Sequence, residues 1–151
     1  MFIKYKLKQF NMSNRTKITV AAIANVSVAK VWGAWNTPAD IIKWNFADPS
    51  WHCTASENNL SVGGKFKHRM EAKDGRFGFD FEGKYNKVEY LKEIVYTMPD
   101  GRSATTMFNE DEGKTHIYTT FDAETQNDPE FQKAGWQAIL NNFVKYIESK
   151  S

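Results

Sequence analysis

Three histidines and one cysteine are the residues of this sequence whose side chains most often carry out chemistry. His52 and Cys53 are adjacent, like a base beside its nucleophile, but neighbouring residues of a strand point to opposite faces of a sheet. Neither His52 nor His116 has a cysteine or aspartate at the spacing of a metal site. The sequence has no Gly-x-Ser-x-Gly elbow and no phosphate-binding loop. We therefore predict no catalytic set, no metal site and no cofactor.

The third histidine, His68, lies in a segment that alternates strictly between apolar and charged residues. Phe66 and Met70 share its face, while lysine, arginine and glutamate occupy the other. A histidine on an apolar face is most often a core residue with satisfied hydrogen bonds; the alternative is a group that orients a ligand. A histidine titrates near neutral pH, so in the second case binding would depend on pH.

The face that carries this histidine continues onto the following segments. Phe77, Phe79 and Phe81 alternate along the next strand and predict a buried wall, and Thr106 and Thr119 take matching positions in a later hairpin. These residues form either a filled core or the lining of a cavity. The candidate ligand-binding residues are Trp44, Phe46, Trp51, Phe66, His68, Met70, Phe79, Phe81, Tyr85, Thr106, Thr119, Trp136 and Leu140.

Three of these candidates, Trp44, Phe46 and Trp51, lie on the connection between a short helix and a strand. Aromatic side chains on a loop are often functional, because loops carry many binding residues. We expect this connection to be either the entrance to a cavity or a lid that packs down for stability.

The elements that position the candidates follow from periodicity and turn residues. Two short helices are predicted at 28–35 and from Pro38, because Thr37-Pro38 interrupts helical spacing. Asp74-Gly75 and Asp100-Gly101 predict tight turns between antiparallel strands. The predicted strands are residues 16–24, 52–57, 65–72, 77–85, 88–98, 103–109 and 115–122.

The stretch from Asp128 to Ser149 predicts one long amphipathic helix. Asp128 is a suitable N-cap, and Pro129 follows at the first helical position, where its missing N–H costs nothing. Apolar residues recur at helical spacing up to Ile147, and the opposite face, which includes Gln132, is polar. Such a helix needs a broad apolar surface to cover it, and the predicted sheet supplies one.

The bulk composition of the 151 residues indicates one globular domain, which we place at residues 13–151 after an extension, residues 1–12, that we expect to be disordered. Three of the 20 basic residues lie in residues 1–11, which hold no acid, so 17 basic residues face 18 acidic ones in the rest. This balance gives no reason to expect nucleic acid as a partner. No apolar run is long enough to span a membrane, and a single cysteine favours a cytoplasmic location.

Four short motifs, in their order and spacing, resemble a known family. They are Val28–Trp35 with Thr37-Pro38 and Trp44, then Gly63-Gly64-Lys65-Phe66, then Phe81-Glu82-Gly83-Lys84-Tyr85, and finally Gly135-Trp136 with Leu140 and Phe143. Over about residues 14–149 the chain resembles the START/Bet v 1-like superfamily. Within it, the chain is most similar to single-domain proteins like the C-terminal domain of the activator of Hsp90 ATPase.

The resemblance implies an α+β helix-grip fold. In that fold a curved antiparallel sheet of about six to seven strands wraps around a long C-terminal helix, two short helices follow the first strand, and an apolar cavity separates sheet from helix. Relatives in the superfamily use this cavity for lipids, hormones, polyketides or nothing known. The two-domain cochaperone also has a separate N-terminal domain, for which 151 residues leave no room, so the resemblance does not carry its activity.

These observations lead to three hypotheses of function. We favour non-catalytic binding of a small hydrophobic or aromatic ligand between the sheet and the C-terminal helix. One alternative is an interaction module that acts beside a chaperone. The other is an enzyme of the cyclase or hydrolase kind, in which His68 is the acid–base group and Tyr85 or Thr119 assists.

Overall fold

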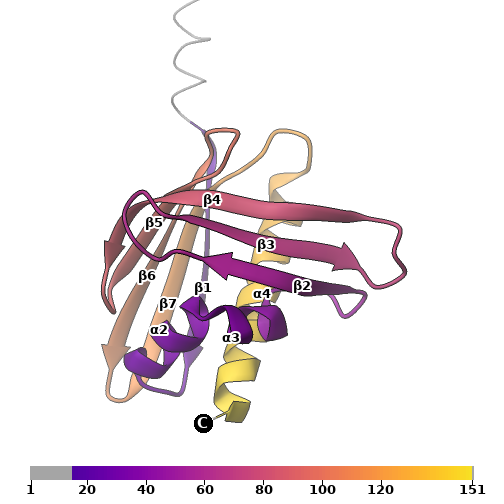
Figure 1. Cartoon of the computed structure of the whole chain (residues 1–151). Helices are drawn as coiled ribbons and strands as arrows, with labels where there is room; N and C mark the ends of the chain where they lie inside the picture. The colour runs from indigo at the N-terminus through magenta and orange to yellow at the C-terminus, as the bar shows by residue number, and fades with distance from the viewer. Residues whose placement is uncertain (1–14, 151) are drawn as a thin grey trace, which may run out of the picture.

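The computed structural model of the protein describes residues 15–150 (Figure 1). The predicted extension, residues 1–12, lies outside them, so the division into an extension and a domain at residues 13–151 stays a prediction. The elements are β1 (Lys17–Ala24), α2 (Val28–Asn36), α3 (Pro38–Trp44), β2 (Trp51–Asn58), β3 (Lys65–Ala72), β4 (Gly78–Glu89), β5 (Glu93–Thr97), β6 (Ser103–Asp111), β7 (Lys114–Asp122) and α4 (Pro129–Lys150).

The seven strands form one antiparallel sheet in the order β1-β7-β6-β5-β4-β3-β2. Because β1 and β2 lie at opposite edges, α2 and α3 carry the chain from one edge to the other. The sheet curves so strongly that β2, β3 and β4 cross in front of α4, whereas β1, β6 and β7 run nearly along it (Figure 1). The predicted α+β helix-grip fold is confirmed.

The predicted strand at residues 88–98 contains β5 but begins too early. Strand β4 continues to Glu89, the chain turns through Leu91 at a φ of 65°, and β5 begins at Glu93. Lys92 N donates to Glu89 O at 2.9 Å and closes this turn. A leucine rarely adopts positive φ, but here its side chain packs against the core, which offsets the strain. The hairpin between β6 and β7 has the expected chemistry, with positive φ at both Glu112 and Gly113.

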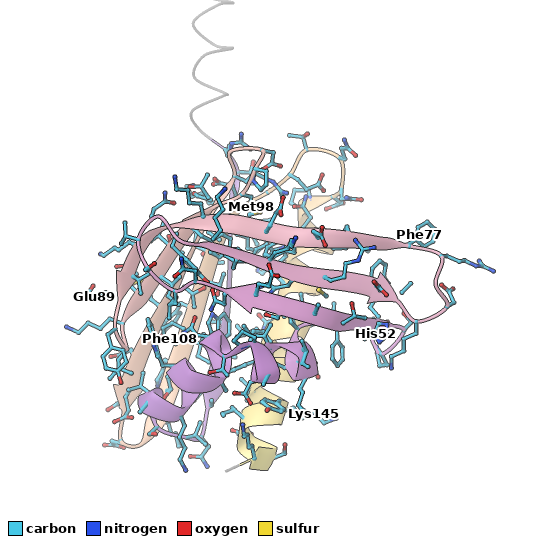
Figure 2. All side chains as sticks on the ribbon, in the orientation of Figure 1. His52, Phe77, Glu89, Met98, Phe108 and Lys145 are labelled. Atoms are coloured by element: carbon cyan, nitrogen blue, oxygen red, sulfur yellow. The ribbon has the colours of Figure 1, made fainter. Side chains whose placement is uncertain are left out.

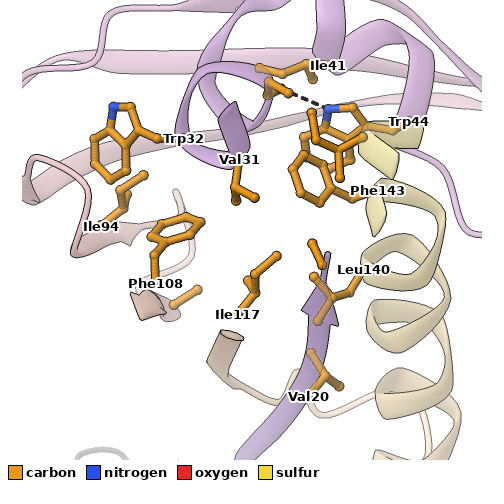
Figure 3. Packing of buried hydrophobic residues seen from close by; sticks show 14 of the residues in the cluster. Val20, Val31, Trp32, Ile41, Trp44, Ile94, Phe108, Ile117, Leu140 and Phe143 are labelled. Carbon is orange, nitrogen blue, oxygen red and sulfur yellow. Dashed lines mark hydrogen bonds between the residues drawn. The ribbon is translucent and has the colours of Figure 1, made fainter. Parts of the chain in front are cut away.

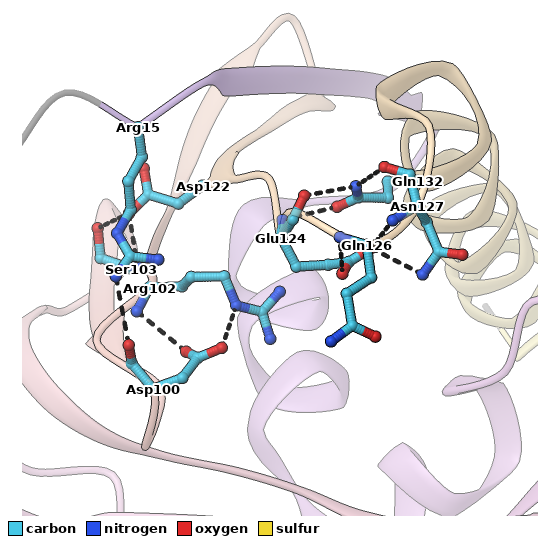
Figure 4. A network of polar contacts seen from close by, with 9 residues as sticks. All are labelled: Arg15, Asp100, Arg102, Ser103, Asp122, Glu124, Gln126, Asn127 and Gln132. Atoms are coloured by element: carbon cyan, nitrogen blue, oxygen red, sulfur yellow. Dashed lines mark hydrogen bonds and ion pairs between the residues drawn. The ribbon is translucent and has the colours of Figure 1, made fainter. Parts of the chain in front are cut away.

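The long helix begins as predicted. Asp128 Oδ1 accepts a hydrogen bond from Glu130 N at 2.8 Å, and Pro129 is the first helical residue. The prediction that Gln132 faces solvent is wrong. Its side chain is buried, because its amide accepts from Glu124 N at 2.9 Å and donates to Glu124 O and Asn127 O at 3.0 and 2.8 Å (Figure 4). Gln132 therefore fixes the loop between β7 and α4.

Side chains of α4 also cover the outer edge of β1. Gln137 Nε2 donates to Ala21 O at 2.9 Å, and Ala21 N donates to Gln137 Oε1 at 3.4 Å. Further along the same edge, Glu148 Oε2 accepts from Asn25 N at 2.8 Å. The helix thus bonds to the edge of the sheet as well as packing on its face.

Fully buried side chains gather where α2 meets the sheet and the C-terminal half of α4 (Figure 3). Val31, Ile117 and Phe143 have no exposed surface there, and the Trp32 ring meets the edge of Phe108 at a centroid distance of 5.4 Å. The one fully buried hydroxyl at this end, on Thr115, donates to Val26 O at 2.8 Å. This region, which we call the closed end, is a filled core.

Candidate functional site

A cavity of about 360 Å³ lies between the concave face of the sheet and α4, at the other end of the same interface. This is within the ~300–1,000 Å³ range of small-molecule sites. Residues of α2, α3, α4 and of the strands line it. The predicted candidates among them are Trp44, Phe66, His68, Met70, Phe79, Phe81, Tyr85, Thr106, Thr119, Trp136 and Leu140. We call this region the hollow end.

Phe46 and Trp51, the other two candidates, do not line the cavity. Trp51 is the first residue of β2 rather than part of a loop, and its ring meets Phe79 edge to face at 5.9 Å. Trp44 ends α3, where its Nε1 donates to Ala34 O at 3.0 Å and its ring stacks on Trp35 at 5.0 Å. The connection after α3 therefore places one of its three aromatic residues on the cavity wall.

The aromatic wall centres on Phe66 in β3. Its ring contacts Tyr85 and Tyr96 at 5.3 and 4.8 Å and stacks on His68 at 5.1 Å. The ring also lies over Gly83 of β4, the cross-strand neighbour, where an added Cβ would be 2.7 Å from two ring carbons. Only glycine leaves room for Phe66 in this position.

The roof of the cavity is Trp136 of α4. Its indole stacks on Phe121 at 3.9 Å with an interplanar angle of 8°, and Phe81 approaches its face at 6.1 Å and 75°. The predicted wall of three buried phenylalanines is wrong for Phe77 and Phe79, which are 66% and 50% exposed. The hairpin of β3 and β4 extends past α4, so none of the described elements covers its tip (Figures 1 and 2).

His68 is buried in the wall and bonds to one neighbour. Its Nδ1 lies 2.9 Å from Ser56 Oγ, on the strand paired with its own. Burial lowers the pKa of His68 from its ordinary 6.5 to about 4, because the charged imidazolium would lose its hydration. The expected titration near neutral pH is therefore wrong, and His68 is a neutral polar group in the cavity at pH 7.

The hydroxyls proposed to assist His68 bond elsewhere. Tyr85 Oη donates to Asn58 Oδ1 at 2.5 Å, and Asn58 Nδ2 in turn donates to Asn36 O at 2.8 Å. Burial raises the pKa of Tyr85, so its hydroxyl stays protonated. Thr119 Oγ1 lies 2.9 Å from Thr106 Oγ1. Among residues 15–150, no hydrogen bond joins His68 to Tyr85 or to Thr119.

Sequence reasoning missed five polar residues of the lining, which are Asn36, Asn45, Asn58, Tyr96 and Arg102. Arg102 comes directly before β6 and has the only permanently charged side chain in the described lining. Its Nε donates to Asp100 Oδ2 at 2.6 Å (Figure 4). The alternation that puts Thr106 on the concave face also includes Arg102, and Tyr96 is in step with buried Ile94. That alternation is present in the sequence, but Asp100-Gly101 predicts a tight turn and the strand predicted after it begins only at residue 103.

A second hollow, of about 660 Å³, lies on the outer face of β3, β4 and β5. Its charged lining residues include Lys65, Lys67, Lys84, Glu57 and Glu82. An apolar ligand would gain little there, so the smaller cavity is the better candidate for one. Within the described residues, no three His, Cys, Asp or Glu side chains gather where they could hold a metal ion.

Comparison with known proteins identifies the family. The family model described as Activator of Hsp90 ATPase homolog 1-like protein matches residues 25–148. The chain belongs to this family.

No helix between residues 15 and 150 has the length and apolarity that a membrane crossing requires.

Solved structures agree with this family membership. The solution NMR structure of the AHSA1-like protein from Aeromonas hydrophila is 44% identical and has a TM-score of 0.84, over 89% of this chain and 94% of that one. A protein of Cytophaga hutchinsonii is 45% identical with a TM-score of 0.78, over 89% and 93%. A protein of Nitrosomonas europaea, 17% identical over 89% and 96%, shares the fold with a TM-score of 0.78. A search of curated proteins found no match.

Proposed function

We propose that the protein binds a small hydrophobic or aromatic molecule in the cavity at the hollow end. The observation that carries this proposal is a cavity of about 360 Å³ walled by Phe66, Phe81 and Trp136, with a few polar groups among the rings. Such a combination suits a ligand that gains free energy from apolar burial and is oriented by hydrogen bonds. The eleven predicted residues that line the cavity are the proposed ligand contacts.

A titration with the neutral fluorescent probe phenylnaphthylamine tests the proposal. We expect saturable binding to the wild type, and loss of at least tenfold in affinity in Ile139→Trp, because residue 139 lines the cavity and an indole would fill it. Ala134→Trp places the same side chain on the exposed surface of the same helix and is the matched control. Equal affinities in all three proteins would contradict the proposal.

Native mass spectrometry of protein purified from its own host would identify the ligand. We expect a mass above that of the polypeptide, and we expect this added mass of a bound molecule to be lost when the protein is unfolded. Ile139→Trp should be recovered without this added mass, whereas Ala134→Trp should keep it.

Interaction with a chaperone is the second candidate, and family membership is the observation that favours it. A pull-down with the cognate Hsp90 tests this directly. Recovery of nothing at micromolar concentration would exclude it.

We also propose a cytoplasmic location, which the single cysteine supports because Cys53 cannot form an internal disulfide.

A further inference from the structure

Several polar side chains line the cavity, and Arg102 is the only permanently charged one among its described lining residues. Asp100 holds this arginine on one side: its Oδ2 accepts from Arg102 Nε at 2.6 Å and its Oδ1 from Arg102 N at 3.1 Å. The guanidinium is therefore fixed at the turn before β6 (Figure 4). Within residues 15–150, its two terminal nitrogens, Nη1 and Nη2, have no hydrogen-bond partner.

Tyr96 contributes a second donor to the same cavity. Its ring packs against Phe66 at 4.8 Å, and its hydroxyl forms no hydrogen bond with any described residue. Burial raises the pKa of Tyr96, so the hydroxyl carries its proton at neutral pH. The positive charge of Arg102 opposes this rise, which places the two groups within electrostatic range of each other.

The carboxylates near Arg102 are already engaged. Asp100 is bound as described, and its main-chain oxygen also accepts from Arg15 Nη2 at 3.3 Å. Glu124 accepts from Gln126 N at 2.8 Å and from Asn127 N and Nδ2 at 2.9 and 2.7 Å. Among the described residues, the terminal guanidinium nitrogens therefore remain donors without acceptors.

Donors without acceptors, beside an aromatic wall, define a chemical class of ligand. We propose that the cavity takes amphiphiles with one anionic head group of the carboxylate class, held by Arg102 and Tyr96, with the apolar body against Phe66 and Phe81. Guanidinium and carboxylate make strong charge-assisted hydrogen bonds, and partial burial strengthens them. This inference rests on the proposed function, because it assigns a head group to the ligand proposed above.

The cavity volume limits the apolar body. About 360 Å³ is the space of about a dozen water molecules at ~30 Å³ each. A bicyclic aromatic acid or a medium-chain fatty acid fits this volume, whereas a phospholipid with two chains does not.

Two fluorescent probes with the same aromatic frame test the inference. Anilinonaphthalene sulfonate is anionic, and phenylnaphthylamine is its neutral counterpart. We expect the wild type to prefer the anionic probe by about tenfold or more, and Arg102→Gln to lose that preference while binding the neutral probe as before. Arg76→Gln, at the exposed turn before β4, removes the same charge elsewhere and should change neither affinity.

A second variant covers the case in which Arg102→Gln fails to fold. The Tyr96 hydroxyl has no hydrogen-bond partner among residues 15–150 to lose, so Tyr96→Phe should fold normally and weaken the anionic probe alone by about threefold. Ile139→Trp should abolish both signals, which assigns them to the cavity. Decanoate should displace the probes at least tenfold better than decanol, which extends the result from sulfonate to carboxylate.

The outcomes separate this inference from the proposed function. Equal affinity for the two probes in the wild type, an anionic preference that survives in Arg102→Gln, or an affinity for the anionic probe that is unchanged in Tyr96→Phe would overturn the head-group assignment and leave the cavity as a neutral site. Equal displacement by decanoate and decanol would overturn the carboxylate class. Failure of both probes to bind would overturn the proposed function and this inference together.

Discussion

The closed end and the hollow end lie on one helix and one sheet but are built differently. At the closed end, Val31, Ile117 and Phe143 are fully buried, and the hydroxyl of Thr115 has a main-chain partner. At the hollow end, the rings surround a cavity, and donors of Tyr96 and Arg102 have no partner within residues 15–150. No buried side-chain nitrogen or oxygen among the described residues lacks a partner, so these free donors lie at accessible surface of the hollow end, whereas the closed end is filled and its hydroxyl is bonded within the fold.

The largest expected effect is at the closed end. Phe143 packs against both Trp35 and Trp44 at 4.9 Å, so Phe143→Ala should lower the free energy of unfolding by about 3–5 kcal/mol. Urea denaturation measures this change. Phe131→Ala, on the exposed surface of the same helix, should change stability by less than about 0.5 kcal/mol. Similar losses in the two variants would remove the distinction between filled core and surface.

The next effect is a pH dependence that His68 produces at the hollow end. Its pKa falls from 6.5 in the unfolded chain to about 4 in the folded one, so the unfolded chain binds more protons between these values. The free energy of unfolding of the wild type should have its full value above pH 6.5 and fall by about 3 kcal/mol as the pH falls to 4.

His68→Leu should remove this part of the pH dependence, as unfolding curves at several pH values would show. At pH 7 the same substitution should alter the affinity of a cavity ligand more than it alters folding. An unchanged pH slope would contradict the buried, neutral state of His68, and unchanged affinity would count against a role for it in binding.

A smaller effect is expected where Gly83 supports the aromatic wall. In Gly83→Ala the new Cβ would lie 2.7 Å from the Phe66 ring, which must move into the cavity. We expect a loss of about 1–3 kcal/mol in the free energy of unfolding and weaker binding of the neutral probe. A stable variant with unchanged binding would show that the wall adapts more freely than this packing implies.

The smallest effect has the opposite sign and involves another glycine. A Cβ on Gly135 of α4 would meet no atom within 4 Å, and the residue is helical. Gly135→Ala should therefore stabilise the protein by about 0.5–1 kcal/mol, because alanine loses less backbone entropy in a helix. Thermal unfolding would measure this gain. A loss of stability would indicate that the helix requires close approach at this position.

Local signals predicted most of the fold. Strict alternation indicated residues 65–72 as a strand, and Asp128 with Pro129 marked the start of α4, because these patterns depend on near neighbours. The break near Leu91 could not be predicted in this way, since no glycine or asparagine marks it and tertiary packing supports the turn. Gln132 was misplaced because its partners come from a loop whose path depends on the whole fold.

Alternation also predicted which side chains face the cavity. It could not predict how much of the concave face of the sheet α4 covers. Phe79 is on the concave face as expected, yet it is half exposed, because α4 does not reach the tip of the hairpin. The burial that lowers the pKa of His68 likewise depends on three-dimensional packing. Arg102 was missed for a different reason: a residue beside a turn was not considered part of the strand pattern that follows it.

The bonds from Gln137 and Glu148 to the outer edge of β1 have a consequence for self-association. A bare edge strand offers its amides and carbonyls to any extended chain, including a second copy of the same protein. Here the C-terminal helix bonds to Ala21 within β1 and to Asn25 just after the strand ends. The helix that closes the interior thereby blocks part of this edge against pairing with another strand.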